Sequence, residues 1–348
     1  MFWVFVAEVP TGAVADYLGR KHSLFAGSIL FGIGMIVYGI TPSFVNFLLA
    51  EFILAIGCAL ISGADEALLY DSLKQEGQEN LAKKIFGRAH TASLLGMMIS
   101  APIGGVIAAK WGLNFPTLLT SIPVFMAGIV AWSFVEPSIK HTVSETKKYT
   151  IIIKDGFKYF FGHPALRKLA FNSLLVATAS YYVIWWYQPL LMRSGIDISV
   201  YGWFHLLLLA SEILISSQFE RLEKWFGSER KYLQVSALLV TLAFLFAALV
   251  PGIISVVILL SVGGGFGLTR IQYMGAIINR HVESDKRATV LSAISMFRKL
   301  ALVPLNPILG LLANKSLPWA LITVSLLPLL IFAVPAGVVL LQKKKLYR

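Results

Sequence analysis

The stretch GAVADYLGRKHSL, residues 12–24, marks the point where an apolar segment ends in an abrupt basic turn. Residues 1–15 are mostly apolar, and a second apolar run begins directly after the turn. Gly19 gives the backbone the freedom to end a helix, and Arg20 and Lys21 follow at once. The pattern predicts two apolar helices joined by a short, positively charged turn.

The composition extends this pattern to the whole chain. Of its 348 residues, 57% are hydrophobic and 14% charged, and the mean hydropathy is +0.75. A soluble domain of this length cannot bury so much apolar surface, whereas a membrane helix needs about 20 mostly apolar residues. Strands of a membrane barrel are about half as long, so these runs indicate helices. We expect eleven spans, at 1–15, 24–40, 45–70, 89–109, 116–135, 169–192, 200–219, 232–250, 253–278, 289–313 and 318–342.

The basic residues are distributed unequally between the two sets of loops. The formal net charge is +12, with 30 Lys and Arg. If the chain crosses the membrane at every span, 24 of them lie on one side, three on the other, and three inside spans. Such asymmetry is typical of cytoplasmic loops and predicts a cytoplasmic C-terminus. The charge therefore reflects membrane orientation, and we expect a lipid bilayer and no nucleic acid as partner.

The longest polar segment, residues 136–168, divides the spans into a group of five and a group of six. We therefore expect an N-terminal helical bundle over 1–135, a cytoplasmic linker over 136–168 and a C-terminal bundle over 169–348. The middle of the linker mixes apolar and basic residues. This mixture fits either an amphipathic stretch on the inner membrane surface or a plain connection.

A weak internal repeat relates the two bundles. The stretch GAVADYLGRKHSL has a degraded counterpart in FERLEKWFGSERKYL, residues 219–233. Likewise, Arg88-Ala89-His90-Thr91 and Arg287-Ala288-Thr289 each open a later span. In this register the first bundle has one helix fewer, at its N-terminus. Two pairs of spans then correspond: 24–40 with 232–250, and 89–109 with 289–313.

The spacing of Gly12, Asp16, Gly19, Arg20 and Lys21 resembles the signature loop between the second and third helices of the major facilitator superfamily. The runs EVPTG, SGADEALLYDSLK and RATVLS also look like bacterial members, so the resemblance covers nearly the whole chain. It implies an all-α membrane protein with two pseudo-symmetric bundles around a midplane site, in the bacterial cytoplasmic membrane. The family has twelve helices, and we expect about eleven here, with the family's first helix missing.

The resemblance also implies a gate at this loop. Family members hold the outward-open state with a charge network that includes the positions of Asp16 and Arg20. We expect Arg20 to pair with Asp71, and Asp16 to face the N-terminal end of the helix at 289–313, where the helix dipole favours a carboxylate. The candidate gating residues are Gly12, Asp16, Gly19, Arg20, Lys21 and Asp71.

Ionisable side chains inside the spans are further candidates, because charge is costly within a membrane. Glu8, Glu51, Glu212 and Arg270 are the main ones. We expect some of them to line the central cavity, with one carboxylate as the site of a coupling proton. The alternative is a static buried pair that joins two helices. For the adjacent acids at 65–66, pairing with loop lysines explains their position equally well.

The span 169–192 is rich in aromatic residues. By the repeat it is the counterpart of the missing first helix, and the resemblance implies that it lines the site. Helical spacing places Tyr181, Trp185 and Gln188 on one face, where aromatic rings can stack on a planar or cationic ligand. Trp186 and Tyr187 are close to the outer end, and we expect them in an interfacial aromatic belt.

The sequence thus predicts a monomeric secondary transporter that works by alternating access. Proton-coupled efflux of an amphipathic small molecule is favoured, because Tyr181 and Trp185 suit a drug-like substrate. Residues 101–105 partly resemble a motif of drug–proton antiporters, and they also fit ordinary close packing and bending of a helix. Glu51 stands where many of these carry an arginine, so proton relay by that arginine is not implied. The alternatives are a nutrient permease for a sugar or an organic acid, and an inactive, N-terminally truncated fragment.

The sequence does not indicate an enzyme, a cofactor or a metal site. No phosphate-binding loop of the Gly-x4-Gly-Lys-Ser/Thr type is present. The glycine-rich run at 263–267 lies in an apolar span, where we expect helix packing or a bend. The six histidines and the single cysteine, Cys58, lack the spacing of metal ligands.

Overall fold

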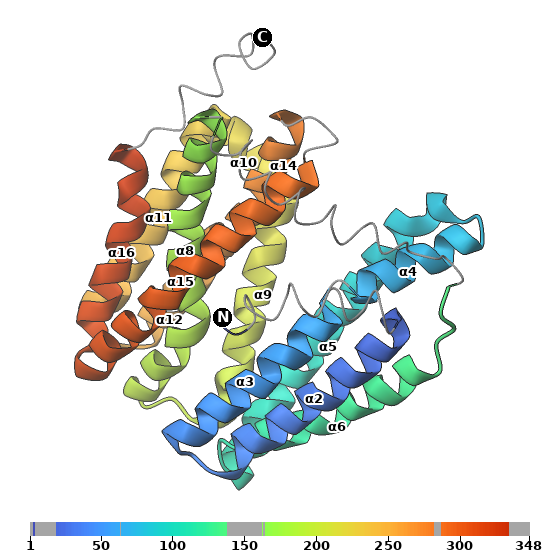
Figure 1. Ribbon diagram of the computed structural model, residues 1–348. Coiled ribbons are helices and arrows are strands. Elements are labelled where there is room, and N and C mark those ends of the chain that lie inside the picture. The colour runs from blue at the N-terminus through green and yellow to red at the C-terminus, as the bar shows by residue number, and fades with distance from the viewer. Residues whose placement is uncertain are drawn as a thin grey trace. The chain divides into compact units, whose positions relative to one another are not determined.

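The computed structural model describes residues 3, 19–62, 64–137, 162, 164–281 and 287–333. The regular structure of these residues is helical throughout. The chain divides into two compact units, Met1–Tyr149 and Thr150–Arg348, and each is described by itself. The first unit contains α2 (Arg20–Ile40), α3 (Phe44–Ile61), α4 (Ala64–Gln75), η1 (Glu79–Leu81), α5 (Ala82–Trp111) and α6 (Phe115–Trp132) (Figure 1).

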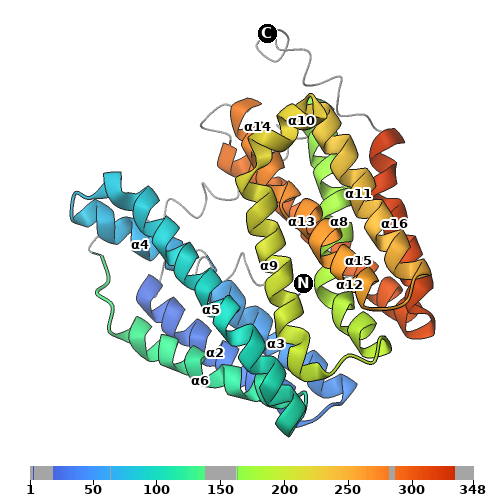
Figure 2. The same ribbon diagram turned by 180° about the vertical axis from the view of Figure 1, so that it is seen from behind.

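The second unit is also entirely helical in its described part. It contains α8 (Pro164–Arg193), η2 (Ile198–Val200), α9 (Tyr201–Ser217), α10 (Phe219–Phe226), α11 (Glu229–Leu249), α12 (Ile253–Ile258), the π-helical η3 (Leu259–Gly264), α13 (Gly265–Leu268), α14 (Arg270–His281), α15 (Arg287–Lys315) and α16 (Leu317–Ala333) (Figure 2).

Within the described ranges, seven helical segments are long and apolar enough to cross a membrane. They coincide with predicted spans, whose existence follows directly from continuous apolar runs. Most of the span predicted at 1–15 and the end of that at 318–342 lie outside the described residues. The seven segments long enough to cross a membrane are Arg20–Ile40, Phe44–Gln75, Glu79–Trp111, Phe115–Trp132, Ile198–Ser217, Glu229–Leu249 and Ile253–Ile277.

In the first unit, α2 packs between α3 and α6 (Figure 1). Glycines make the contact with α3 unusually close. A Cβ atom added to Gly57 would lie 2.7 Å from the backbone nitrogen of Phe31 and 2.9 Å from the carbonyl oxygen of Gly27. The two helix backbones therefore touch, in the manner of small-residue contacts between membrane helices.

The second unit repeats this arrangement around α11, which packs against α16 on one side and η3–α13 on another. The central helix of each unit also follows a glycine of positive φ. Gly19 precedes α2 with φ 93°, and Gly227 lies just before α11 with φ 93°. The predicted correspondence between the spans at 24–40 and 232–250 therefore has a counterpart in the packing of α2 and α11.

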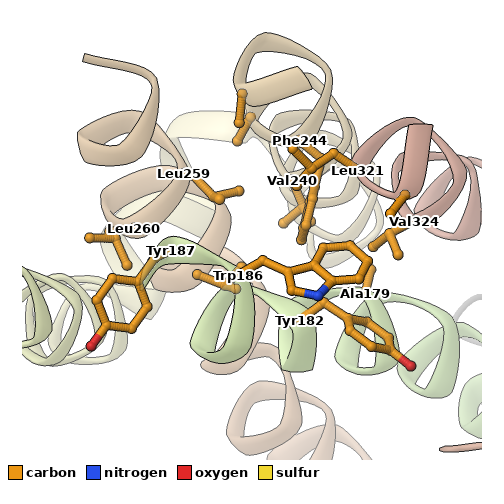
Figure 3. Packing of buried hydrophobic residues seen from close by; sticks show 14 of the residues in the cluster. Ala179, Tyr182, Trp186, Tyr187, Val240, Phe244, Leu259, Leu260, Leu321 and Val324 are labelled. Atoms are coloured by element: carbon orange, nitrogen blue, oxygen red, sulfur yellow. The ribbon is translucent and has the colours of Figure 1, made fainter. Parts of the chain in front are cut away.

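The core of the second unit forms where α8 meets α11, η3 and α16 (Figure 3). Trp186 and Tyr187 are buried in this core, with 6% and 3% of their surface exposed. The prediction of an interfacial belt at these two residues was wrong. Closeness to the end of a span gives depth along the membrane normal, but it does not give the face of the helix on which a side chain lies.

The glycine-rich run lies in a span that departs from regular α-helix. Residues Leu259–Gly264 form a π-helix between α12 and α13. A Cβ on Gly264 would lie 2.2 Å from Leu208 Cδ1, and one on Gly267 would lie 1.8 Å from Ser180 Oγ. The run therefore lets this span approach α8 and α9 closely, which confirms the interpretation as helix packing.

Candidate transport site and gate

The predicted ion pair between Arg20 and Asp71 is present and links the first turn of α2 to α4. The two side chains are mostly buried, with 14% and 12% of their surface exposed. Lys21, the next residue, places its ammonium group 5.3 Å from the ring centre of Trp132 at the end of α6. The two basic residues at the start of α2 therefore contact α4 and α6.

Glu136 also contacts the start of α2, and the sequence did not predict this. Its carboxylate accepts hydrogen bonds from the backbone N–H groups of Arg20 and Lys21, both at 2.8 Å. It thus supplies the N-terminal cap of α2, where the helix dipole favours a negative charge and Gly19 offers no side chain. The φ of 93° favours glycine at position 19, and a Cβ there would also lie only 3.1 Å from the Glu136 carboxyl carbon.

Replacing Glu136 with glutamine is expected to destabilise the first unit by about 1–2 kcal/mol, because the amide lacks the charge and one of the two acceptor oxygens. Thermal unfolding of the purified chain in detergent measures this loss. Glu79→Gln, at an exposed position in η1, is the control and should leave the midpoint unchanged. Equal midpoints for Glu136→Gln and the unmodified chain would show that the cap is energetically unimportant.

The gating residues Gly12 and Asp16 lie outside the described residues, as does Glu8. The expected contact of Asp16 with the helix at 289–313 therefore stays a prediction. Of the candidate gating residues, Gly19, Arg20, Lys21 and Asp71 are described, and Glu136 contacts the first two residues of α2 beside them.

The two described glutamates among the proton-site candidates lie on different units. Glu51 is exposed on α3, and Glu212 is half-buried on α9, one to two turns before the helix ends at Ser217. Neither forms a hydrogen bond or an ion pair with another residue in the described ranges. Asp65 and Glu66 are also exposed, at the start of α4.

Arg270 has no exposed surface and lies inside the second unit. Its Nη1 donates to the carbonyl of Leu233 at 2.8 Å and to Ser236 Oγ at 2.6 Å, and its Nη2 donates to Asn172 Oδ1 at 2.6 Å. Its Nε has no partner among the described residues. The guanidinium thus joins α14 to α8 and α11 through neutral acceptors, and no static pair with Glu51 or Glu212 is found in the described ranges.

Asp71 and Arg270 occupy equivalent places in the repeat. Each lies 17 residues before the arginine that marks the repeat, Arg88 in one half and Arg287 in the other. In the first unit this place holds a carboxylate paired with an arginine near the end of a helix. In the second unit it holds an arginine surrounded by neutral groups. The charge pattern of the gate is therefore not repeated in the second unit.

The aromatic residues of α8 divide between the core and an exposed face. Trp185 is 57% exposed and its ring centre lies 6.0 Å from that of Tyr181, which is half-buried. Gln188 is exposed and donates to the Tyr187 hydroxyl at 3.2 Å. The expected common face of Tyr181, Trp185 and Gln188 thus presents two aromatic rings and an amide.

A hydrogen bond between side chains joins α8 to α15. The Tyr182 hydroxyl donates to Asn306 Oδ1 at 2.8 Å. Asn306 lies between Pro304 and Pro307 in an otherwise apolar stretch of α15. A lone amide in such a stretch is a signal that could have identified this residue from the sequence.

Apolar helices long enough to cross a membrane, with buried polar residues between them, indicate a multi-pass membrane protein. The family model of the Major Facilitator Superfamily matches residues 1–304, and the chain belongs to this family. The fold agrees with solved transporters. The nucleoside transporter NupG has a TM-score of 0.75 at 14% identity, covering 99% of this chain and 89% of that one. A bacterial homolog of the human lysosomal transporter Spinster has a TM-score of 0.65 at 16% identity, covering 97% and 86%.

The curated sequence relatives match only part of this chain. The uncharacterized MFS-type transporter YuxJ of Bacillus subtilis is 25% identical over 181 residues, 52% of this chain and 43% of that protein. The chloramphenicol resistance protein CraA of Acinetobacter baumannii is 23% identical over 153 residues, 44% of this chain and 35% of that protein. The matched part thus spans less than half the length of each relative.

Proposed function

We propose that the protein exports an amphipathic small molecule in exchange for protons, by alternating access of its two bundles. The observation that carries the proposal is Glu212, a half-buried carboxylate inside a membrane span that has no fixed partner among the described residues. A buried carboxylate is costly to keep charged unless a cation or hydrogen bonds compensate it. Binding and release of a proton removes that cost in one part of the transport cycle.

Arg20 and Arg270 have fixed contacts, whereas the proposal requires a side chain that gains and loses a proton. Arg20 has a carboxylate partner in Asp71, and both Nη atoms of Arg270 donate hydrogen bonds to neutral acceptors. No ion pair with Glu212 is found for Arg270 within the described part of the second unit. In this proposal Glu212 carries the proton, while the Arg20–Asp71 pair stabilises one of the two end states of the cycle.

The substrate class follows from the exposed face of α8. The rings of Tyr181 and Trp185 and the amide of Gln188 suit a planar or cationic molecule with both apolar and polar parts. The relative CraA is named for resistance to chloramphenicol, a small amphipathic molecule, which supports export of this class.

Reconstitution of the chain in vesicles tests the proposal. A pH gradient should drive accumulation of an aromatic cation such as ethidium, and Glu212→Gln should reduce this accumulation several-fold while leaving passive exchange of the dye intact. Glu220→Gln, an exposed position on α10, is the matched control and should transport normally. Unchanged gradient-driven transport by Glu212→Gln would contradict the role of this carboxylate, and Glu51→Gln then tests the other described candidate.

A further inference from the structure

Helix α10 (Phe219–Phe226) connects two membrane spans. The spans Ile198–Ser217 and Glu229–Leu249 flank it directly, so it must lie at the membrane surface rather than across the bilayer. Its eight residues extend for about 12 Å, and Gly227, with φ 93°, ends it before Ser228 caps α11. Figure 2 shows α10 at the shared end of α9 and α11.

One face of α10 is fixed to the second unit. Phe219, Leu222 and Phe226 pack against a buried cluster from α11 and α14, and on the same side Glu223 accepts a hydrogen bond from the Tyr273 hydroxyl at 3.0 Å. The orientation of the helix about its own axis is thereby set. The cluster consists of Tyr232, Leu233, Tyr273, Met274 and Ile277.

The opposite face presents an aromatic ring among basic side chains. Arg221, Lys224 and Trp225 are neighbours at helical spacing, and all three are exposed, Trp225 to 80%. The indole stacks on Phe226 with ring centres 5.3 Å apart and remains exposed. Between residues 218 and 231, four exposed bases, Arg221, Lys224, Arg230 and Lys231, accompany a single exposed acid, Glu220.

We propose that this outward face of α10, formed by Arg221, Lys224 and Trp225, is a contact surface for anionic lipid headgroups. An indole with a polar N–H and a large apolar ring is most stable at the membrane–water interface. Basic side chains beside it meet the phosphates of anionic lipids, and each adds roughly fivefold to the partitioning onto such a surface. The bond between Glu223 and Tyr273 then connects this lipid contact to α14.

Site-directed fluorescence measures the depth of the proposed contact. Cys58 is the only cysteine, so Cys58→Ser provides a background for single labels. Bimane is attached at Trp225→Cys and, as the control, at Glu76→Cys, an exposed residue after α4. We expect doxyl lipid to quench the label at 225 clearly more strongly than the label at 76. Quenching of both labels by aqueous iodide alone would overturn the proposal.

The charge of the lipid is tested with the same label. Quenching at position 225 should be stronger in vesicles of phosphatidylethanolamine and phosphatidylglycerol than in vesicles of phosphatidylcholine. The double variant Arg221→Gln/Lys224→Gln should lose this difference, and persistence of the difference in that variant would overturn the headgroup contact. Both side chains are exposed, so the variants keep the packing of α10. The readout is independent of transport and therefore of the proposed function.

Discussion

The Asp71→Asn variant is expected to transport about 10- to 100-fold more slowly than the unmodified protein while it remains folded. Arg20 and Asp71 are mostly buried, and asparagine keeps an acceptor oxygen but removes the charge that forms the ion pair. Hydrogen bonds between charged groups contribute about 1.5–3 kcal/mol, and this free energy is removed from the end state that contains the pair. The balance between the two end states then shifts by the corresponding factor, and the cycle slows at the step that restores the lost state.

A charge exchange distinguishes this effect from a general loss of structure. Arg20→Asp combined with Asp71→Arg should recover part of the transport rate in proteoliposomes, because the pair is re-formed with reversed polarity. Asp65→Asn, at an exposed position on the same helix α4, is the control and should transport normally. A fully active Asp71→Asn variant would show that the pair has no part in the cycle.

The Gly57→Ala variant is expected to be less stable by about 1–3 kcal/mol. The added methyl carbon would lie 2.7 Å from the backbone nitrogen of Phe31, and a backbone atom cannot rotate away as a side chain can. The helices α2 and α3 must therefore separate, with loss of contact along their whole crossing.

Gly104→Ala is a control that should not lower the stability. Gly104 lies in α5, and a Cβ there would meet no atom within 4 Å. Alanine at that position should be neutral or stabilising by up to about 1 kcal/mol, since glycine is the poorer helix former. Thermal unfolding in detergent compares both variants, and equal midpoints for the two would contradict the close contact between α2 and α3.

The sequence predicted those features that depend on local patterns. Continuous apolar runs located the described membrane spans, and the spacing of Gly19 and Arg20 located the turn before α2. They did not predict α10, the division of 45–70 into α3 and α4, or the start of α5 seven residues before 89. The pairing of Arg20 with Asp71 followed from the family resemblance and is confirmed. Such features depend on residues near one another in sequence or on a motif of fixed spacing.

The features that the sequence did not predict depend on which face of a helix a side chain occupies. Glu136 caps a helix whose first residue is 116 positions away in the sequence. In its own segment it is simply a carboxylate at the end of an apolar span, which does not indicate a cap. Trp186 and Tyr187 have the composition of an interfacial belt but face the core. The neutral acceptors of Arg270 come from α8 and α11, and no periodicity in those helices distinguishes them.

The π-helical turn at Leu259–Gly264 affects how the span tolerates insertions and deletions. A π-helical turn holds one residue more than an α-helical turn, so the loss of one residue there can be absorbed by a return to regular helix. The residues that follow, including Arg270, then keep their direction toward α8 and α11. In a regular helix such as α11, the same loss would rotate every later residue by about 100°. This span can therefore change length during evolution without losing its buried arginine contacts.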